Sequence, residues 1–520
     1  MPDTQVIVAG GGPVGLAAAV ELGRRGVRVL VVEPRRTVSR ARPRCKTISV
    51  RSMEHLRRWG VADELRSRAP LSTGWSQDVV FCTSLTGFEL SRFTGVLGLA
   101  PEGDRFPELG QQVPQYLLEE LLRDVVAELP SCTLLTGRSV TDVAQDEHEV
   151  RVTVRDEHGH ETTVTAEYVI GADGPRSTVR DRIGAAYEGE HALRPNFGMV
   201  FTAPDLWPRV RHGTAVHYWI VNPQAPALMG PIDRDGTWWM IAFGVDRETG
   251  ERDARRLIAA AAGTSVDATV LSTDPWTARM QLVDRMRQGR VFLAGDAAHL
   301  NPPFGGHGLN TGLGDAVDLG WKLAAVLAGW GGPALLDSYE GERRPIQQRV
   351  IREATANMAV TSTELLADNL AADDDAGRLA RQAADGRIQA TKHAEFHSLE
   401  LVLDIRIDGS PVLAPGDRAA VGARLAHAWL DGRSLFDELG PGLTLLVLTR
   451  EAAPQADLIE RAAARRAVPL ARLDLADRGL RSRYGADLLL VRPDQYVAWA
   501  GDHAAAADGV IDLVRGAGRG

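Results

Sequence analysis

Residues 6–16 read Val6-Ile-Val-Ala-Gly-Gly-Gly-Pro-Val-Gly-Leu16, and this stretch decides how the chain begins to fold. A short apolar strand leads into Gly10, Gly12 and Gly15, and an apolar helix follows these glycines. The N-terminus of such a helix offers unpaired N–H groups and the positive end of its dipole, and glycines let a pyrophosphate come close enough to use them. The spacing therefore predicts a βαβ unit that binds a dinucleotide.

Glu33 supports this prediction from the second strand. It closes the apolar run 27–33, about twenty residues after the glycines, where a carboxylate would accept hydrogen bonds from a ribose with a free 2′-hydroxyl. A chance glycine turn in an ordinary α/β unit would give no reason for an acid at that distance. We therefore expect Glu33 and the glycine segment, including Pro13 and Val14, to contact the cofactor.

Length and composition limit the classes of protein to consider. A chain of 520 residues is too long for one hydrophobic core, so we expect roughly two to four domains. A formal net charge of -9 leaves no basic surface for nucleic acid. The cysteines Cys45, Cys82 and Cys132 form no Cys-x-x-Cys pair, which argues against a disulfide framework, a metal site and a redox-active dithiol.

The hydrophobic runs do not indicate a membrane protein. A membrane span needs about 18 consecutive apolar residues, and the longest candidate, residues 323–336, is interrupted by Gly331, Gly332 and Pro333. The N-terminus runs directly into the first strand without a basic and apolar leader. We therefore expect a cytoplasmic protein with no membrane partner.

Apolar periodicity predicts an α/β fold with several kinds of segment. Helical patterns cover residues 50–59 and 115–129, and residues 72–114 are typical of strands and loops. Residues 150–164 alternate like a hairpin, and residues 168–171 resemble a buried parallel strand. Residues 354–397 are Ala-rich, charged and helical, which suggests a bracing connector.

The middle of the chain is rich in aromatic residues. Strand-like runs between residues 182 and 284 carry five tryptophans, which suggests a sheet with an aromatic face against a flat apolar ligand. For any single residue, a place in an aromatic core is the alternative. His217 and Trp219 on one strand, together with Trp239, are candidate substrate-lining residues, and the sequence does not settle which face of the sheet they occupy.

A second specific segment reads Gly295-Asp-Ala-Ala-His-Leu-Asn-Pro-Pro-Phe-Gly-Gly-His-Gly-Leu-Asn310. Asp296 follows an apolar strand, at the end where doubly wound sheets bind their ligands, and its carboxylate could accept a hydrogen bond from a ribityl hydroxyl. Gly308, Leu309 and Asn310 open a helix whose N–H groups and dipole favour an anion. A reduced flavin is such an anion, so this segment favours FAD.

At this point the chain resembles a known family, the class A flavoprotein monooxygenases with the p-hydroxybenzoate hydroxylase fold. The resemblance covers roughly residues 1–350 and rests on the first glycine segment with Glu33, on Gly171-Ala-Asp-Gly-Pro-Arg-Ser-Thr-Val-Arg180, and on the segment ending at Asn310. It implies that Asp296 holds the ribityl chain, that residues 308–310 face the flavin pyrimidine edge, and that Asp173 lies beside the pyrophosphate. It also makes Arg44 and Gln115 FAD contacts; without it, Arg44 is a surface charge and Gln115 a helix cap.

The same resemblance implies a domain plan. It predicts a Rossmann-like FAD-binding domain, a substrate-binding β-sheet domain and a C-terminal thioredoxin-like α/β domain. The expected ranges are 1–181 and 286–345 for FAD binding, 182–285 with 72–114 for the substrate sheet, 346–398 for a helical connector, and 399–520 for the terminal domain. The terminal domain contains no cysteine, so packing or subunit contact is its expected role, in a monomer or homodimer.

For the reaction, the resemblance implies that NADPH or NADH reduces FAD and that O2 adds to give a flavin C4a-hydroperoxide. The distal oxygen of this group would pass to a phenolic ring. The backbone carbonyl of Pro303 would face the substrate and the hydroperoxide, with Phe304 beside it. His307 could pass a proton, and a solvent-facing loop histidine is the alternative.

Several functions remain open from the sequence. A flavin-dependent halogenase is disfavoured because Trp238-Trp-Met-Ile241 differs from the Trp-x-Trp-x-Ile-Pro signature. A single dinucleotide fingerprint also disfavours disulfide reductases and the usual Baeyer-Villiger enzymes. A Baeyer-Villiger or epoxidising member of the same family stays possible, as does a non-catalytic flavin-binding interaction protein. The favoured function is hydroxylation of an aromatic small molecule, a polycyclic phenol from an aromatic polyketide pathway.

Overall fold

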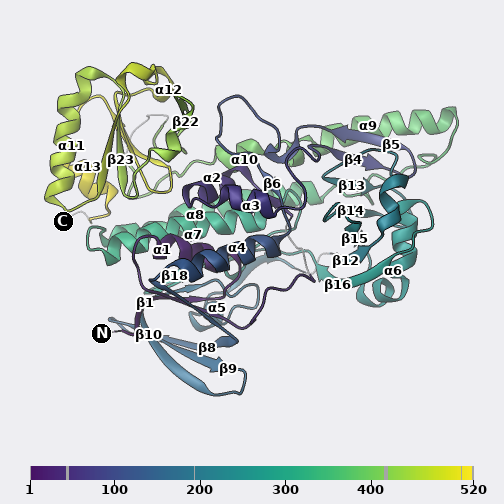
Figure 1. The fold of residues 1–520 in the computed structure, drawn as a ribbon, viewed down its shortest axis with the longest axis horizontal. Helices are drawn as coiled ribbons and strands as arrows, with labels where there is room; N and C mark the ends of the chain where they lie inside the picture. The colour runs from purple at the N-terminus through teal and green to yellow at the C-terminus, as the bar shows by residue number, and fades with distance from the viewer. Residues whose placement is uncertain (1, 42–45, 192–193, 415–419, 505, 518–520) are drawn as a thin grey trace.

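The computed structural model describes residues 2–41, 46–191, 194–414, 420–504 and 506–517. Two long helices, α7 (His307–Leu327) and α8 (Pro333–Met358), run through the middle of the molecule (Figure 1). The N-terminal sheet lies on one side of these helices (Figure 1). The yellow-green C-terminal domain lies at one end of the molecule, and a second large sheet lies at the other end (Figure 1). None of the helices in the described ranges is long and apolar enough to cross a membrane.

The first sheet brings the two glycine segments together. Its strands run in the order β18-β19-β10-β1-β2-β7, and β1, β2, β7, β10 and β19 are parallel neighbours along this path. The carboxyl ends of parallel strands meet at one edge, so the segments that follow β1, β10 and β19 become neighbours there. The bounds are β1 (Thr4–Ala9), α1 (Pro13–Gly23), β2 (Val29–Glu33), α4 (Gln115–Glu128), β7 (Cys132–Thr136), β10 (Glu161–Gly171), β18 (Arg287–Gln288) and β19 (Val291–Leu293).

Strand β10 combines two elements that the sequence predicted as separate. Its first half, Glu161 to Ala166, pairs antiparallel with β9 (Val150–Asp156), and β9 pairs with β8 (Arg138–Gln145). Its second half continues as the parallel partner of β1 and β19. The predicted hairpin and the predicted buried strand are therefore one long strand that changes partners at Ala166. Periodicity could not show this, because the change is in the pairing and not in the local backbone.

The second sheet is built from distant parts of the chain. Its order is β16-β12-β15-β14-β13-β4-β5, and β13 pairs in parallel with β4 although more than a hundred residues separate them. Helix α6 packs on one face, and α9 packs against β5. The bounds are β4 (Val79–Cys82), β5 (Glu89–Phe93), β12 (Pro195–Thr202), β13 (His217–Ile220), β14 (Ala227–Pro231), β15 (Thr237–Phe243), α6 (Arg247–Ala262), β16 (Thr269–Thr277) and α9 (Asp375–Phe396).

Helix α9 does more than the connector that its composition suggested. Its Ile388 and Phe396 belong to the same buried cluster as Phe81 and Trp219 of the second sheet. The helix therefore completes the core of that sheet. Smaller elements join the three parts: β3 (Thr47–Ile48), α2 (Val50–Arg58), α3 (Ala62–Arg68), β6 (Gln111–Gln112), α5 (Thr178–Arg182), β11 (Tyr187–Glu190), β17 (Met280–Val283), β20 (His299–Leu300) and α10 (Leu399–Leu403).

The C-terminal domain contains a four-stranded sheet in the order β24-β23-β25-β26. β23 is parallel to β24 and antiparallel to β25, and two helices, α11 and α13, pack against each other beside this sheet. This order confirms the thioredoxin-like arrangement predicted from the sequence. The bounds are β21 (Trp429–Leu430), β22 (Arg433–Ser434), β23 (Leu443–Val447), α11 (Ala453–Arg465), β24 (Leu470–Asp474), α12 (Arg481–Tyr484), β25 (Leu488–Val491), β26 (Val497–Gly501) and α13 (Ala507–Val514).

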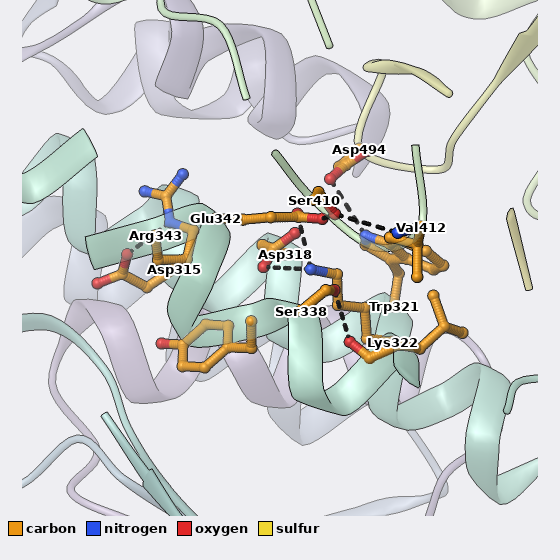
Figure 2. Close-up of polar contacts among 12 residues, drawn as sticks. Asp315, Asp318, Trp321, Lys322, Ser338, Glu342, Arg343, Ser410, Val412 and Asp494 are labelled. Carbon is orange, nitrogen blue, oxygen red and sulfur yellow. Dashed lines mark hydrogen bonds and ion pairs between the residues drawn. The ribbon is translucent and has the colours of Figure 1, made fainter. Parts of the chain in front are cut away.

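A buried charge cluster joins the C-terminal domain to α7 and α8 (Figure 2). Lys322 Nζ donates to Asp318 at 3.0 Å and to Glu342 at 2.7 Å. Arg492 donates to the same two carboxylates at 2.9 Å and to Asp494 at 2.5 Å. Three carboxyl groups thus face two cations in a region closed to water, so full ionisation would leave one buried negative charge without compensation.

Asp318 is the group we expect to keep a proton in this cluster. Burial raises the pKa of its carboxyl to about 7, whereas an unfolded aspartate titrates near pH 4. The native chain then holds a proton that the unfolded chain has lost, so the free energy of unfolding should fall as pH rises from about 4 to 7. The variant Asp318→Asn should show a flatter profile in urea denaturation. Identical profiles for the two proteins would contradict this assignment.

Candidate active site

The glycines of the first segment let two loops touch. Gly10 has a φ of +101°, and a Cβ atom there would lie 2.3 Å from the carbonyl oxygen of Ala172, in the loop after β10. A Cβ on Gly15 would lie 1.9 Å from the carbonyl oxygen of Gly10. Both positions therefore require glycine, because the backbone of the protein itself comes close there.

Gly12 differs from these two because the space in front of it is open. A Cβ atom on Gly12 would meet no heavy atom within 4 Å. Gly12 is also the N-cap of α1, where no side chain caps the helix, Pro13 occupies the first turn, and that turn contains no acid. Free N–H groups, open space and no negative charge are the features that fit a pyrophosphate.

Glu33 lies at the carboxyl end of β2, where the sequence predicted it, with 3% of its surface exposed. Its Oε2 accepts the Gly11 amide at 2.7 Å. Its Oε1 accepts the Nε–H of Arg35 at 2.7 Å, and Arg35 also contacts Glu119 of α4. The carboxylate is thus fixed against the glycine loop. The contacts with Gly11 and Arg35 were not foreseen from the sequence.

Asp173 follows β10 and lies against the first glycine loop, since a Cβ on Gly10 would come within 2.9 Å of its Cα. Its carboxylate accepts the Ser177 hydroxyl at 2.5 Å and the Val179 amide at 3.1 Å. Burial raises the pKa of this carboxyl. Asp173 therefore holds the start of α5 at the place where the sequence puts the pyrophosphate.

The segment after β19 packs against α1 and α7. Gly295 has a φ of +60°, and Cβ atoms on Gly295 and Gly312 would come within 2.9 and 2.7 Å of Val14 Cγ2. Val14 of α1 therefore packs between the two glycines. Asp296 follows in a short turn with its side chain exposed, at the carboxyl edge of the parallel sheet, and its backbone carbonyl accepts the Tyr187 hydroxyl.

Asp315 of α7 is a site residue that sequence reasoning missed. Its Oδ2 accepts the Gly295 amide at 3.1 Å and His299 Nε2 at 2.8 Å, and its Oδ1 accepts Arg343 Nε at 2.8 Å. Burial alone would raise its pKa, but Arg343 and His299 lower it to about 2. An ionised Asp315 thus holds residues 295–299 in place. Its partners come from two other segments, residues 295–299 and α8, so no local pattern predicted its role.

Asn310 fastens the start of α7 to the start of α2. Its Oδ1 accepts the Ser49 amide at 2.9 Å and the Ser52 hydroxyl at 2.7 Å, and its Nδ2 donates to the carbonyls of Thr47 and Gly306. The side chain is therefore fully used inside the protein, and only the backbone of Asn310 remains for the predicted cofactor contact.

The N-terminus of α7 is open in the same way as that of α1. It has no capping side chain and no acid in its first turn. A Cβ atom on Gly308 would meet nothing within 4 Å, and Leu309 packs against the core. Asn301 lies in the preceding loop. Both polar atoms of its side chain, Oδ1 and Nδ2, are buried without partners among the described residues. These features fit the predicted flavin edge.

The two predicted catalytic residues, Pro303 and His307, lie around the start of α7 and differ in their exposure to solvent. Pro303 is exposed, and its carbonyl accepts the Gly306 amide at 3.0 Å. His307 is buried, which corrects the alternative of a solvent-facing loop histidine, because its ring packs against Gly305. Burial lowers the pKa of His307 to about 4, so it is neutral near pH 7. Its Nε2 has no partner among the described residues.

All four substrate-lining candidates lie on one side of the second sheet. His217 and Trp219 share a face of β13, the rings of His217 and Trp239 are 6.2 Å apart, and those of Trp219 and Phe304 are 6.0 Å apart. Trp219 is fully buried and stacks on Phe81 at 5.3 Å, so it takes the aromatic-core alternative. His217 and Trp239 are partly exposed and remain the better lining candidates.

Helix α9 adds a buried ion pair to this region that the sequence did not indicate. Lys392 Nζ donates to Glu395 at 2.7 Å and to the Asn357 carbonyl at 2.8 Å. The ammonium also lies 4.5 Å from the centre of the Trp219 ring. Glu395 accepts the Gly305 amide, which ties α9 to the loop before α7.

The remaining predicted contacts are less defined. Gln115 is half-buried and is the first residue of α4, and the N-cap of that helix is Pro114 and not Gln115. Arg44 lies outside the described residues. Within the described ranges, no group of three or more His, Cys, Asp and Glu side chains is placed to hold a metal ion.

Comparisons with known proteins agree with this geometry. Residues 3–354 match a family described as FAD binding domain, and residues 418–516 match the aromatic-ring hydroxylase C-terminal family. A putative polyketide hydroxylase from Streptomyces halstedii is 32% identical over 538 residues, which cover 95% of this chain and 92% of that protein.

Solved structures extend the likeness to the whole fold. A structure of RebC, soaked with chromopyrrolic acid and holding 7-carboxy-K252c, has a TM-score of 0.91 and 33% identity and covers 99% of both chains. A ternary complex of aklavinone-11 hydroxylase with FAD and aklavinone has a TM-score of 0.84 and 28% identity, with the same coverage. The family uses FAD, NAD(P)H and O2. The chain thus belongs to the FAD-dependent aromatic hydroxylases of the class A flavoprotein monooxygenases.

Proposed function

We propose that this enzyme hydroxylates a flat, polycyclic phenolic compound of the aromatic polyketide class. The observation that carries the proposal is the position of the partly exposed His217 and Trp239, which lie on the face of the second sheet whose buried core reaches Phe304 of the loop before α7. A flat aromatic molecule held against this face would lie next to the segment that binds the flavin ring. The names of the relatives support a polyketide substrate.

The residues that would hold FAD follow from the two open helix ends. The N-terminus of α1 with Gly12 would take the pyrophosphate and Glu33 the ribose, while Asp296 would take the ribityl chain. The backbone of residues 308–310 would meet the pyrimidine edge. When bound and reduced by NADPH or NADH, FAD activates O2 and supplies the oxygen atom that enters the substrate ring.

The protein's own part is to bind, orient and exclude water. Phe304 and the aromatic cluster behind it form an apolar surface beside the flavin segment, which keeps water from the reacting ring. His307 is neutral near pH 7, so its unpartnered Nε2 can accept a hydrogen bond or, in the other tautomer, donate one. His307 is therefore the residue that would pass a proton. The Pro303 carbonyl already accepts the Gly306 amide, so it has one lone pair left for a further contact.

Products formed under labelled oxygen test this proposal. The FAD-loaded enzyme is given NADPH or NADH and a panel of hydroxylated naphthalenes and anthraquinones under ¹⁸O2, and products are analysed by mass spectrometry and NMR. We expect one compound or more to stimulate NAD(P)H oxidation and to gain one ¹⁸O as a ring hydroxyl. Insertion next to a carbonyl would identify a Baeyer-Villiger enzyme instead. Hydrogen peroxide without labelled product across the panel would count against hydroxylation of this class.

A further inference from the structure

Lysine is nearly absent from this chain: Lys322 and Lys392 are buried, and Lys46 is half-buried. The sequence contains only Lys46, Lys322 and Lys392 among 59 basic residues, the rest being arginine. Lys322 is paired with Asp318 and Glu342, and Lys392 is paired with Glu395. Lys46 has no carboxylate partner among the described residues. An ammonium group that leaves water without an opposite charge is costly, so this exception calls for an explanation.

Lys46 lies between the cofactor loop and the aromatic face of the second sheet. Its neighbour Thr47 receives a hydrogen bond from Asn310 at the start of α7. Its own Nζ donates to the Val216 carbonyl at 2.9 Å and lies 5.5 Å from the centre of the Trp239 ring. Burial lowers the pKa of Lys46 to about 7. The group therefore lies beside the expected substrate, on the side that contains His217 and Trp239.

The side chains around Lys46 offer more donors than acceptors. Trp239 Nε1 is a buried donor without a partner among the described residues, and His217 Nε2 is likewise buried without one. Lys46 brings three N–H bonds, of which the Val216 carbonyl accepts one. Neutral His217 can itself accept one hydrogen bond through Nε2 in one of its tautomers, so at least two of the four N–H bonds of Lys46 and Trp239 are left without a described acceptor. What is missing is an oxygen with negative charge.

Gly230 keeps the space between these side chains free. It pairs with Trp239 across the sheet, on the strand next to His217. A Cβ there would lie 2.9 Å from the Val216 carbonyl, 3.1 Å from Trp239 Nε1 and 3.2 Å from His217 Cβ. A side chain at this position would therefore press on the acceptor of Lys46 and on both unpartnered rings.

We propose that Lys46, with Trp239 and His217, forms a subsite for an anionic oxygen on the aromatic substrate, either a carboxylate or an ionised phenol. The inference rests on the proposed function for the location of the substrate, and it adds the charge that the substrate must carry. The bound anion supplies the missing acceptor and neutralises Lys46. Lys46 is therefore a specificity-determining residue that holds the anionic edge of the ring system at the sheet.

Equilibrium binding to the FAD-loaded enzyme tests the charge requirement without turnover. The probes are 2-naphthoate with its neutral analogue 2-naphthamide, and 7-hydroxycoumarin with 7-methoxycoumarin, followed by the flavin absorbance change and by tryptophan quenching. We expect the wild type to prefer at least one anionic probe over its neutral analogue, and Lys46→Met to weaken that probe by about tenfold or more. The pair that responds identifies the carboxylate or the phenolate as the anion.

The control is Arg234→Met, which removes an exposed cation over another tryptophan, Trp75, in the same domain. This variant should bind every probe as the wild type does. Equal weakening of neutral and anionic probes in Lys46→Met would mean a packing role and would overturn the proposal, as would a wild type without preference for either anion. Failure of the labelled-oxygen experiment would leave this binding result intact, so the two proposals fail separately.

The protonation state of Lys46 gives a second measurement. Reductive methylation with ¹³C-formaldehyde labels lysine amines for NMR, and the signal missing in Lys46→Met belongs to Lys46. We expect this signal to titrate near pH 7. If the preferred anion binds tenfold better to the charged amine than to the neutral one, its binding should raise the titration midpoint by about one pH unit. The charged or titratable side chains nearby are His217 and the Lys392–Glu395 pair. A titration that the anion leaves unchanged would contradict the subsite.

Discussion

Replacement of Gly12 by alanine is expected to weaken FAD binding by about 10–100-fold while the protein still folds. A Cβ at this position meets no protein atom within 4 Å, so the side chain fits the protein itself. It would occupy the space in front of the α1 amides and keep a pyrophosphate from approaching them. The loss of one charge-assisted hydrogen bond costs about 1.5–3 kcal/mol, which corresponds to this loss of affinity.

Flavin fluorescence titration of the apoprotein measures this loss. Gly12→Val should have a larger effect than Gly12→Ala, because it fills more of the same space. The free energy of unfolding of the apoprotein should change by less than about 1 kcal/mol in the alanine variant. Gly341→Ala is the matched control: a Cβ there also meets nothing within 4 Å, but the residue lies inside α8. It should bind FAD normally. Unchanged FAD affinity in both Gly12 variants would refute the predicted cofactor position.

Replacement of Arg492 by methionine is expected to destabilise the enzyme by about 3–5 kcal/mol. Arg492 is buried and donates to Glu342, Asp318 and Asp494, so its removal leaves three carboxyl groups with Lys322 as their remaining cation. Glu342 and Asp318 lie on α8 and α7, whereas Arg492 and Asp494 belong to the C-terminal domain. The substitution should therefore weaken the attachment of the C-terminal domain to α7 and α8 as well as lower the free energy of unfolding of the whole protein.

Urea denaturation and limited proteolysis measure the two effects. We expect an earlier unfolding transition and faster cleavage between α10 and β23 in Arg492→Met. Arg465→Met is the control, since Arg465 forms an exposed ion pair with Asp508 in the same domain and its removal should cost at most about 1 kcal/mol. Equal stability losses in the two variants would show that the buried cluster contributes nothing special to docking.

The sequence predicted most elements because their signals are local. The helix expected over residues 115–129 is α4 (Gln115–Glu128), and the helix expected over residues 50–59 is α2 (Val50–Arg58). Apolar periodicity and glycine or proline boundaries are read over a few residues, and these elements follow them. Strand β10 is the exception, because its change of partner at Ala166 depends on what lies beside it.

The candidate site residues also divide into those marked by local sequence signals and those that depend on contacts between distant segments. Gly10, Gly15 and Glu33 act within one βαβ unit, so their spacing was sufficient to predict where they lie. Asp315 and Lys46 were missed, because their partners lie far away in the chain and no local pattern marks them. Trp219 was predicted to line the substrate site and is instead enclosed by Phe81 and the α9 helix.

By itself the sequence determined the cofactor class, the family resemblance and the order of the domains, since glycine spacing and strand-to-helix transitions are properties of short segments. Tertiary structure alone decided which charges are paired, which aromatic residues reach the surface, and that α9 completes the second sheet. The physical reason is that desolvation and pairing depend on neighbours brought from distant segments. Lys46 shows this directly: its sequence neighbours do not mark it, and only the fold reveals an ammonium group without a described acid.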